Sequence, residues 1–263
     1  MNAVLEVKDI GIDFGGVRAV DEVSFEIRPG QIFSIIGPNG AGKTTMFNLI
    51  SGVYTPSRGA VKLAGEDVTG LPPHRLARLG LSRTFQNLQV YFRMTAVENV
   101  MVGRHIHEHV GITAQLFNLP SVRAQNRASR QKAMELLDFV GLADKADEPA
   151  GSLPYGALKR LEIARSLALG PKLLLLDEPA AGCNAVETEE IDGLIQEIAK
   201  SGVTVALVEH DMRLVMKISD RILVLDYGRK LIEGTATEVR NDPEVIAAYL
   251  GAHGQTEAAR ADH

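Results

Sequence analysis

Residues 37–44 combine the residue types and the spacing that hold phosphate groups. They read Gly-Pro-Asn-Gly-Ala-Gly-Lys-Thr and match the pattern G-x-x-x-x-G-K-[ST], the P-loop or Walker A motif. Three glycines let the backbone curl so that successive N–H groups point inward at phosphate oxygens. Lys43 is then expected to reach the β- and γ-phosphates of a nucleotide, and the Thr44 hydroxyl is expected to bind Mg²⁺.

The elements on either side of this loop should position it. The apolar run Ile32–Ile36 is typical of a buried strand, and the apolar residues within 46–50 favour a helix. The N-terminus of that helix would direct its partial positive charge at the phosphates. A glycine-rich turn before an ordinary helix is the alternative interpretation, and the rest of the chain has to decide between the two.

Two further apolar strands end in polar side chains. Residues 173–176 are all leucine, and Asp177 and Glu178 follow them. A carboxylate delivered beside a P-loop in this way is the Walker B arrangement, so Asp177 is expected to hold Mg²⁺ through water. Glu178 is placed to take the proton of an attacking water. His210 follows the apolar run 203–208, at the sheet edge where ligands bind, and we expect it to contact the γ-phosphate or that water.

Gln86 is a polar side chain at the junction between the core and a helical stretch. It is predicted to complete the coordination of Mg²⁺ and to report the nucleotide state to that stretch.

Three histidines spaced by two suggest a different metal site: His105, His107 and His109. On a strand they would share one face, whereas on a helix they would spread around it. A solvated surface segment is therefore the favoured interpretation.

The order of the predicted elements indicates the fold class. Residues 4–36 form strands, residues 81–156 are mostly helical with loops, and strands alternate with helices from residue 158 onward. Alternation of this kind predicts a mostly parallel sheet. We expect an α/β protein with a P-loop NTPase core, an N-terminal antiparallel β subdomain and an inserted α-helical subdomain. The predicted limits are a single domain over 1–251, with core and β subdomain in 1–87 and 157–251, the helical subdomain in 88–156, and a disordered tail at 252–263.

Composition excludes several classes of protein. The net charge is −5, from 28 Lys and Arg against 33 Asp and Glu, which argues against a nucleic-acid partner. Cys183 is the single cysteine, so an intrachain disulfide is impossible and a reducing compartment fits. No apolar run approaches the ~20 residues that a membrane span needs. Any action at a membrane would therefore depend on a partner chain.

In this order and spacing, the motifs resemble the ATP-binding subunits of ABC transporters, over about residues 5–251. The resemblance adds an aromatic residue, Phe14, that would stack on adenine, and a signature region that would complete the ATP site of a second subunit. The predicted ATP-binding residues are Phe14, Gly37, Pro38, Asn39, Gly40, Ala41, Gly42, Lys43, Thr44 and Thr45. The signature residues are Leu153, Pro154, Tyr155, Gly156 and Ala157.

The same resemblance implies an ATPase that uses ATP and Mg²⁺, with two ATP molecules held head to tail between two subunits. The implied partners are a second ATP-binding subunit, identical or different, two transmembrane permease subunits and, indirectly, an extracytoplasmic substrate-binding protein. The helical block would swing, and a cleft near residues 86–101 would hold the permeases. The expected location is the cytoplasmic face of the inner membrane.

A narrower resemblance points to the branched-chain amino acid importers. The stretches that carry it are 83–87, 180–184, 208–212 and 242–251. Urea and short-amide importers are similar, so import of such compounds is an alternative, as is lipid export. A soluble ABC ATPase of DNA repair or of the ribosome is a further alternative. Such proteins usually carry two ATPase units, coiled coils or zinc modules, whereas this chain has one P-loop and one cysteine.

The signature region departs from the usual Leu-Ser-Gly-Gly-Gln of the family. Pro154 has neither a hydroxyl nor an N–H group, so two possible donors to a γ-phosphate are absent. The N–H groups of Gly156 and Ala157 are expected to remain available. We therefore predict that, beside a different ATP-binding chain, the site built on this chain's Walker motifs is the more active of the two.

Overall fold

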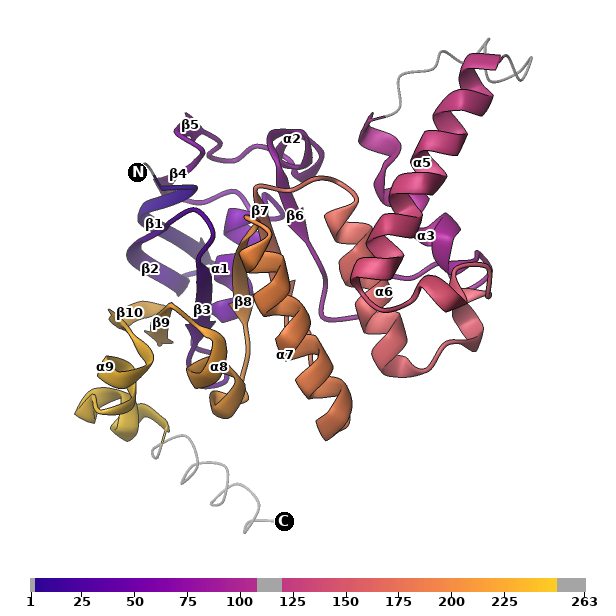
Figure 1. Cartoon of the computed structure of the whole chain (residues 1–263). Coiled ribbons are helices and arrows are strands. Elements are labelled where there is room, and N and C mark those ends of the chain that lie inside the picture. Colours follow the sequence, from indigo (N-terminus) through magenta and orange to yellow (C-terminus); the bar gives the residue numbers. More distant parts are fainter. Residues whose placement is uncertain (1–2, 108–119, 250–263) are drawn as a thin grey trace.

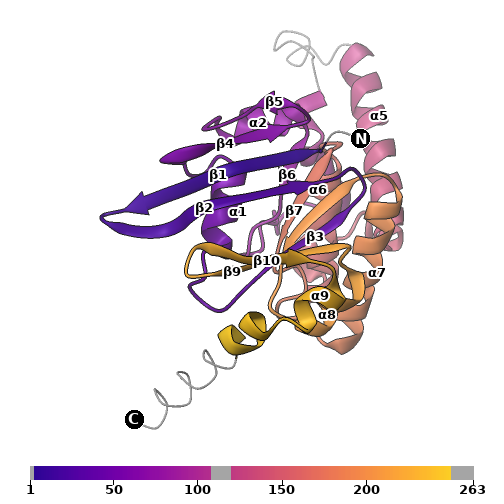
Figure 2. The same ribbon diagram turned by 90° about the vertical axis from the view of Figure 1, so that its left-hand side faces the viewer.

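A computed structural model of the chain describes residues 3–107 and 120–249 (Figure 1). Its N-terminal part is an antiparallel sheet in the order β2-β1-β4-β5. Its strands are β1 (Leu5–Phe14), β2 (Val17–Ile27), β4 (Arg58–Leu63) and β5 (Glu66–Asp67). Strands β1 and β2 form the long hairpin seen in Figure 2, and it turns at Gly15 and Gly16, which both have positive φ.

The second sheet forms the core, in the order β10-β9-β3-β8-β7-β6. Its strands are β3 (Ile32–Ile36), β6 (Leu81–Arg83), β7 (Leu173–Asp177), β8 (Thr204–Val208), β9 (Arg221–Asp226) and β10 (Arg229–Gly234). The pairs from β9 to β6 are parallel, and β10 runs antiparallel to β9. The predicted mostly parallel sheet is therefore confirmed. Strand β6 lies in the stretch that we expected to be mostly helical. The sequence did not reveal it, because three residues are too few to show the alternation of a strand.

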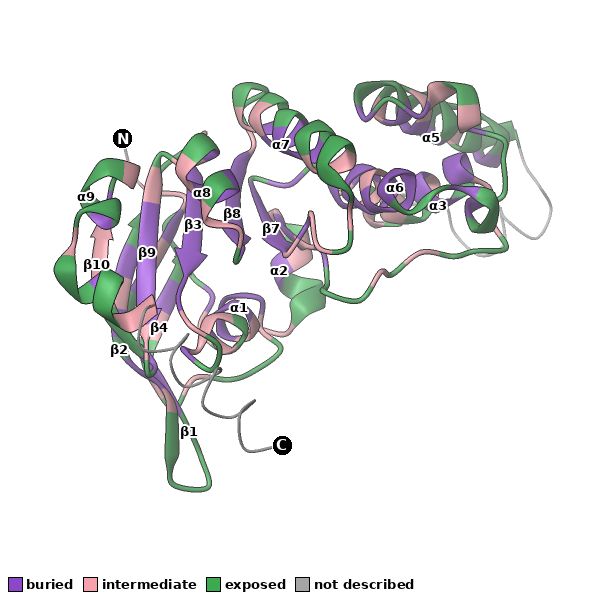
Figure 3. Ribbon diagram, turned by 90° about the horizontal axis from the view of Figure 1, so that it is seen from below, coloured by how far each residue is buried: buried purple, intermediate pink, exposed green. Residues whose placement is uncertain are grey.

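Helices cover both faces of the core sheet (Figure 3). They are α1 (Lys43–Ile50) and α2 (Pro73–Leu79) on one side, and α7 (Ala185–Lys200) and α8 (Met212–Ile218) on the other. Alternate residues of one strand face opposite sides: Leu173 and Leu175 pack with α1, whereas Leu174 and Leu176 pack with α7. Burial on both faces explains why residues 173–176 of β7 form a continuous apolar run. Helix α9 (Ala236–Arg240) and the helical residues 243–249 follow β10.

The helical block lies to one side of the two sheets in Figure 1. Its helices are α3 (Ala96–Gly103), α5 (Pro120–Phe139) and α6 (Tyr155–Leu167). Thr95 starts α3 with a capping box to Glu98, the residue three positions along the chain. Apolar residues of α3, α5 and α6 join one cluster with residues of α7, so the block is packed onto the core.

Neither a membrane span nor the histidine site appears in the described part of the chain. Over residues 3–107 and 120–249, no helix combines the length and the hydropathy that crossing a membrane requires. The same residues contain no cluster of three or more His, Cys, Asp or Glu that would hold a metal. His105 and His107 lie in a short 3₁₀ helix, and His109 lies outside the described residues, as does the predicted tail.

Candidate nucleotide site

The loop between β3 and α1 lines a pocket of about 610 Å³. The predicted residues that line it are Asn39, Gly40, Ala41, Gly42, Lys43, Thr44, Thr45, Gln86 and Glu178. They share the pocket with Val17, Arg18 and Ala19 of β2 and with Tyr227. The structure thus brings together residues from five separate segments of the chain, of which the sequence identified three: residues 39–45, Gln86 and Glu178.

Two glycines of the loop are required by close approaches of other backbone segments. A β-carbon on Gly37 would lie 2.1 Å from the carbonyl oxygen of Leu225, and Gly37 has φ 151°. A β-carbon on Gly42, at φ 100°, would lie 2.7 Å from the carbonyl oxygen of Ala19. Any larger residue would therefore push the loop out of its place between β9 and β2.

The side chain of Lys43 holds the loop together by donating to backbone carbonyls of the loop. Its Nζ donates to the carbonyl oxygens of Gly37, at 2.6 Å, and Pro38, at 3.0 Å. Burial lowers the pKa of Lys43, and the charge of Glu178 opposes this effect. A bound phosphate would offer the ammonium group a stronger acceptor than these neutral carbonyls, so Lys43 can change partners on binding.

Gln86 and Glu178 line the pocket, and His210 lies beside Glu178 without lining the pocket itself. Gln86 Nε2 donates to Glu178 Oε2 over 3.3 Å, and His210 Nδ1 lies 3.9 Å from Glu178 Oε1. The proximity of Glu178 and His210 follows from the sheet order, because β7 and β8 are parallel neighbours and end at the same edge. The Glu178 N–H also donates to the Val208 carbonyl oxygen, which ties the two strand ends together.

Asp177 is buried and is already paired with a residue that our sequence analysis did not assign a role. Its Oδ2 accepts from Arg83 Nη2 at 2.8 Å. Arg83 Nη1 donates in addition to Asn48 Oδ1 and Ser51 Oγ, each at 2.7 Å, on or beside α1. Arg83 thereby joins β6, β7 and α1 behind the pocket. The only signal in the sequence for this role was a basic residue three positions before Gln86, and that signal does not show that Asp177 is its partner.

Phe14 is not among the residues that line the pocket. Its ring is 45 % exposed and meets Tyr54 edge to face, with 5.3 Å between the ring centres. Val17, three residues along the same hairpin, does line the pocket. Adenine stacking by Phe14 stays a prediction. It would require the β1–β2 hairpin to present both Phe14 and Val17 to the adenine.

The signature residues lie at the start of α6, away from this pocket. Pro154 is the N-cap residue and makes no side-chain capping bond, and the next three residues form the first turn. The N–H of Gly156 donates to Glu187 Oε1 at 3.2 Å. This group is therefore engaged within the chain, although we expected it to remain available. The reason is that Glu187, which completes the capping box of α7, also reaches across to α6.

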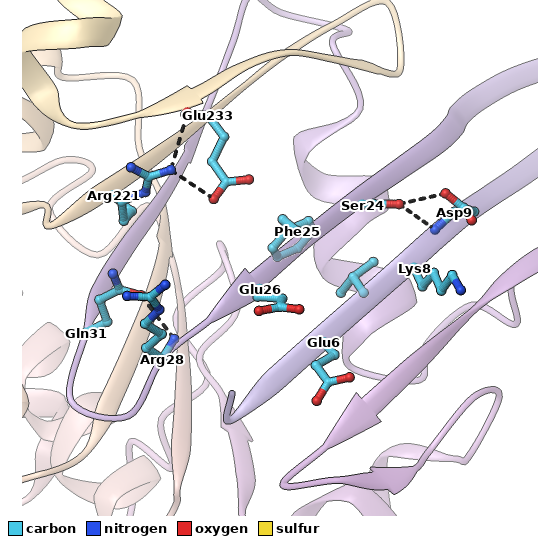
Figure 4. Close-up of a pocket in the computed structure, with 11 residues that line it drawn as sticks. Glu6, Lys8, Asp9, Ser24, Phe25, Glu26, Arg28, Gln31, Arg221 and Glu233 are labelled. Carbon is cyan, nitrogen blue, oxygen red and sulfur yellow. Dashed lines mark hydrogen bonds and ion pairs between the residues drawn. The ribbon is translucent and has the colours of Figure 1, made fainter. Parts of the chain in front are cut away.

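A second pocket, of about 590 Å³, lies between the β1–β2 hairpin and the β9–β10 hairpin (Figure 4). Two of its charged groups pair with each other, and a third is hydrogen-bonded to a serine that also lines the pocket. Arg221 pairs with Glu233 at 3.4 Å, and Asp9 accepts from the Ser24 hydroxyl at 2.8 Å. No residue of the P-loop lines it, so it is separate from the nucleotide site.

The chain is similar to known proteins over nearly its whole length. The model of the ABC transporter family matches residues 20–181, and that of the branched-chain amino acid ATP-binding cassette transporters matches residues 229–254. The high-affinity branched-chain amino acid transport ATP-binding protein BraF of Pseudomonas aeruginosa is 46 % identical, covering 94 % of this chain and 98 % of that protein. LivG of Escherichia coli K12, described in the same words, is 44 % identical with the same coverage.

Solved structures agree with the fold. An ATP-binding cassette of an ABC transporter in its ADP conformation matches with a TM-score of 0.82 at 31 % identity, covering 95 % of this chain and 100 % of that one. A dimeric ATP-binding cassette bound to ADP and Pi matches with a TM-score of 0.73 at 25 % identity, covering 88 % and 98 %.

Proposed function

The chain belongs to the ATP-binding proteins of branched-chain amino acid ABC transporters, and from this premise we propose how its residues power import of these amino acids. The observation that carries the proposal is the meeting of Gln86, Glu178 and His210 beside the P-loop pocket, in a chain 46 % identical to such a protein. The fold is that of an α/β ABC ATPase. The subdomain limits stated above, with the helical block at 88–156, are part of the proposal.

ATP would bind with its phosphates on residues 37–45. The backbone N–H groups and the N-terminus of α1 face the phosphates, and Lys43 moves from its carbonyl acceptors to the β- and γ-phosphates. Phe14 would stack on the adenine. Glu178 would take the proton of the attacking water, while His210 holds the water or the γ-phosphate.

The residues present also fit Mg²⁺. A hydroxyl from Thr44, an amide oxygen from Gln86 and a carboxylate from Asp177 form an all-oxygen donor set of the kind that Mg²⁺ prefers, and Thr44 and Gln86 line the same pocket. The ion would neutralise charge on the phosphates. One oxygen of Asp177 is committed to Arg83, so the other would reach Mg²⁺ through water.

This pocket is half of a complete site. None of residues 153–157 lines it, and a similar solved ATP-binding cassette is dimeric. Both observations support the view that these residues serve a second ATP-binding subunit. If that subunit is a different chain, we expect the site with this chain's Walker residues to be the more active one. Replacing the Walker B glutamate in each chain in turn, and finding equal losses of ATPase activity, would disprove the asymmetry.

The remaining partners are two transmembrane permeases and, through them, an extracytoplasmic binding protein, with this chain on the cytoplasmic face of the membrane. A groove of about 470 Å³ beside Gln86 supports a permease contact. Three aromatic side chains at or near it are about half exposed: Phe85 at 45 %, Tyr91 at 51 % and Phe92 at 52 %.

An uptake assay tests the substrate. The chain would be expressed with its permeases, its partner ATP-binding subunit and its substrate-binding protein in cells that lack their own branched-chain ATP-binding subunits. Uptake of labelled leucine and of labelled urea would then be compared. Leucine uptake that Lys43→Ala abolishes is the expected result. Uptake of urea without leucine would instead support the amide-import alternative.

A further inference from the structure

The C-terminal helical stretch, residues 243–249, is packed against the strand that leads into the P-loop. Val245 is buried in a cluster with Ile36, the last residue of β3, and with Val215 of α8. Tyr249 packs against the same cluster. This stretch lies within residues 229–254, which match the branched-chain family model. The part of the chain that matches the branched-chain family model therefore packs against the last residue of β3, directly before the P-loop.

The hydroxyl of Tyr249 is placed next to the P-loop backbone. Its oxygen is buried and has no hydrogen-bond partner of good geometry among the described residues. The N–H of Gly37 lies close enough to this oxygen to act on it electrostatically. Burial raises the pKa of Tyr249 to about 12, and the Gly37 N–H opposes this rise. A buried polar group left without a partner is costly, so this hydroxyl calls for an explanation.

The carbonyl group of Gly37 already has a hydrogen-bond donor. Its carbonyl oxygen accepts from Lys43 Nζ at 2.6 Å, and a β-carbon at this position would meet the Leu225 carbonyl oxygen. When Lys43 turns to a phosphate, the Gly37 carbonyl loses its strongest partner. The N–H and the packing beneath it then have to keep this first residue of the loop in place.

Tyr249 also contacts the element that follows His210. With Met212 and Met216 of α8 it lines an apolar groove of about 580 Å³. Helix α8 begins directly after Asp211, whose Oδ1 accepts from the Arg213 N–H at 2.9 Å. The ring thus packs near the strand that leads into the P-loop and beside α8, the helix that begins two residues after His210.

We propose that Tyr249 is a positioning residue of the nucleotide site, whose hydroxyl accepts from the Gly37 N–H when nucleotide draws Lys43 away from the loop. Its ring keeps β3 and α8 in register, and its hydroxyl fixes the first peptide of the P-loop for phosphate binding. The inference rests on the proposed nucleotide site and adds to it a contribution from the C-terminal helix.

The test measures nucleotide affinity of the full chain with a fluorescent ATP analogue. Tyr249→Phe removes only the hydroxyl, and we expect it to raise the Kd by about two- to tenfold, the value of one hydrogen bond. Ile246→Ala is the matched control, because Ile246 lies on the same helical stretch and is 47 % exposed. In the assembled transporter, Tyr249→Phe should raise the KM for ATP and leave kcat within about twofold.

The outcomes separate this inference from the nucleotide site itself. If the wild-type chain does not bind nucleotide, both fail. If the wild-type chain binds, Lys43→Ala does not, and Tyr249→Phe equals the wild type in Kd and KM, only the role of Tyr249 fails. A lower melting midpoint of Tyr249→Phe with an unchanged Kd would equally overturn it, because that result describes a purely structural tyrosine.

Discussion

Glu178 has a backbone conformation that a residue other than glycine adopts only at a cost. Its φ is 49°, in the left-handed region, which costs about 1–3 kcal/mol and persists where the surroundings impose it. Here the Glu178 N–H is held by the Val208 carbonyl, and its carboxylate is met by Gln86. The strained turn aims the side chain back at the P-loop, which an extended continuation of β7 would not do.

Glu178→Gln should separate binding from hydrolysis. The amide keeps the shape and the contact to Gln86 but cannot take a proton, so ATP binding should persist while turnover falls ~10²-fold or more. Size-exclusion chromatography in the presence of ATP should also show a trapped dimer. ATPase activity close to that of the wild type in the assembled transporter would remove Glu178 as the base.

Arg83→Met should destabilise the fold. The arginine and Asp177 are both almost fully buried, at 6 % and 4 % side-chain exposure. Removing one partner leaves a buried carboxylate without its counter-charge, which costs about 3–5 kcal/mol. Chemical denaturation would measure this. Arg123→Met, at an exposed position of α5, should change the free energy of unfolding by less than about 0.5 kcal/mol. A similar small change in Arg83→Met would contradict the account.

At the scale of elements, α6 and α7 are connected at their N-termini. Glu187 accepts from the N–H of Asn184 in its own capping box and from the N–H of Gly156 in α6. The Glu187 carboxylate therefore links the signature turn to the segment before α7. An anion from a partner subunit that needs the Gly156 N–H would have to displace this carboxylate.

Gly156→Ala tests this connection. A β-carbon at Gly156 would lie 2.7 Å from the Glu187 carboxylate, so that side chain has to leave and its hydrogen bond is lost. Gly193→Ala in α7 is the matched control, because its β-carbon would meet nothing within 4 Å. Gly156 lies in the first turn of α6 and Gly193 in the interior of α7, so Gly193→Ala gains at least as much helix propensity. With the hydrogen bond lost in addition, Gly156→Ala should be less stable than Gly193→Ala by at least about 1.5 kcal/mol. Equal effects in thermal unfolding would disprove the connection.

For the whole molecule, two buried carboxyl groups shape how stability depends on pH. Burial raises the pKa of Glu209 and of Glu162 above the ordinary value of 4.5, and backbone N–H donors partly offset it. A group whose pKa is higher in the folded state binds more protons there than in the unfolded chain. Its contribution to stability is therefore present below about pH 4.5 and is lost as the pH rises through the raised pKa.

Glu209→Gln should flatten this dependence. In the wild type the N–H groups of Ala180 and His210 donate to different oxygens of the Glu209 carboxylate. The single amide oxygen of glutamine can keep one of these hydrogen bonds, and the loss of the other does not depend on pH, while the titrating charge is gone. We expect the variant to gain stability relative to the wild type as the pH rises above 4.5 towards neutrality, measured by urea unfolding across that range. A difference that stays constant with pH would show that Glu209 does not titrate there.

The sequence by itself determined the features that depend on neighbouring residues. The P-loop, the capping box at Thr95 and the end of α2 at Gly80 each lie within a few consecutive residues, where local hydrogen bonds and allowed φ values decide the structure. The order of the motifs was sufficient to identify the family and to predict the parallel core.

Only the tertiary structure decided which distant groups meet. Arg83 and Asp177 are 94 residues apart and pair because β6 and β7 are neighbours in the sheet. Gly156 and Glu187 are 31 residues apart and meet because α6 and α7 share a packed cluster. Tyr249 faces Gly37 because the C-terminal helical stretch folds back onto β3. No local spacing encodes such contacts, since they depend on the packing of elements that are remote in the chain.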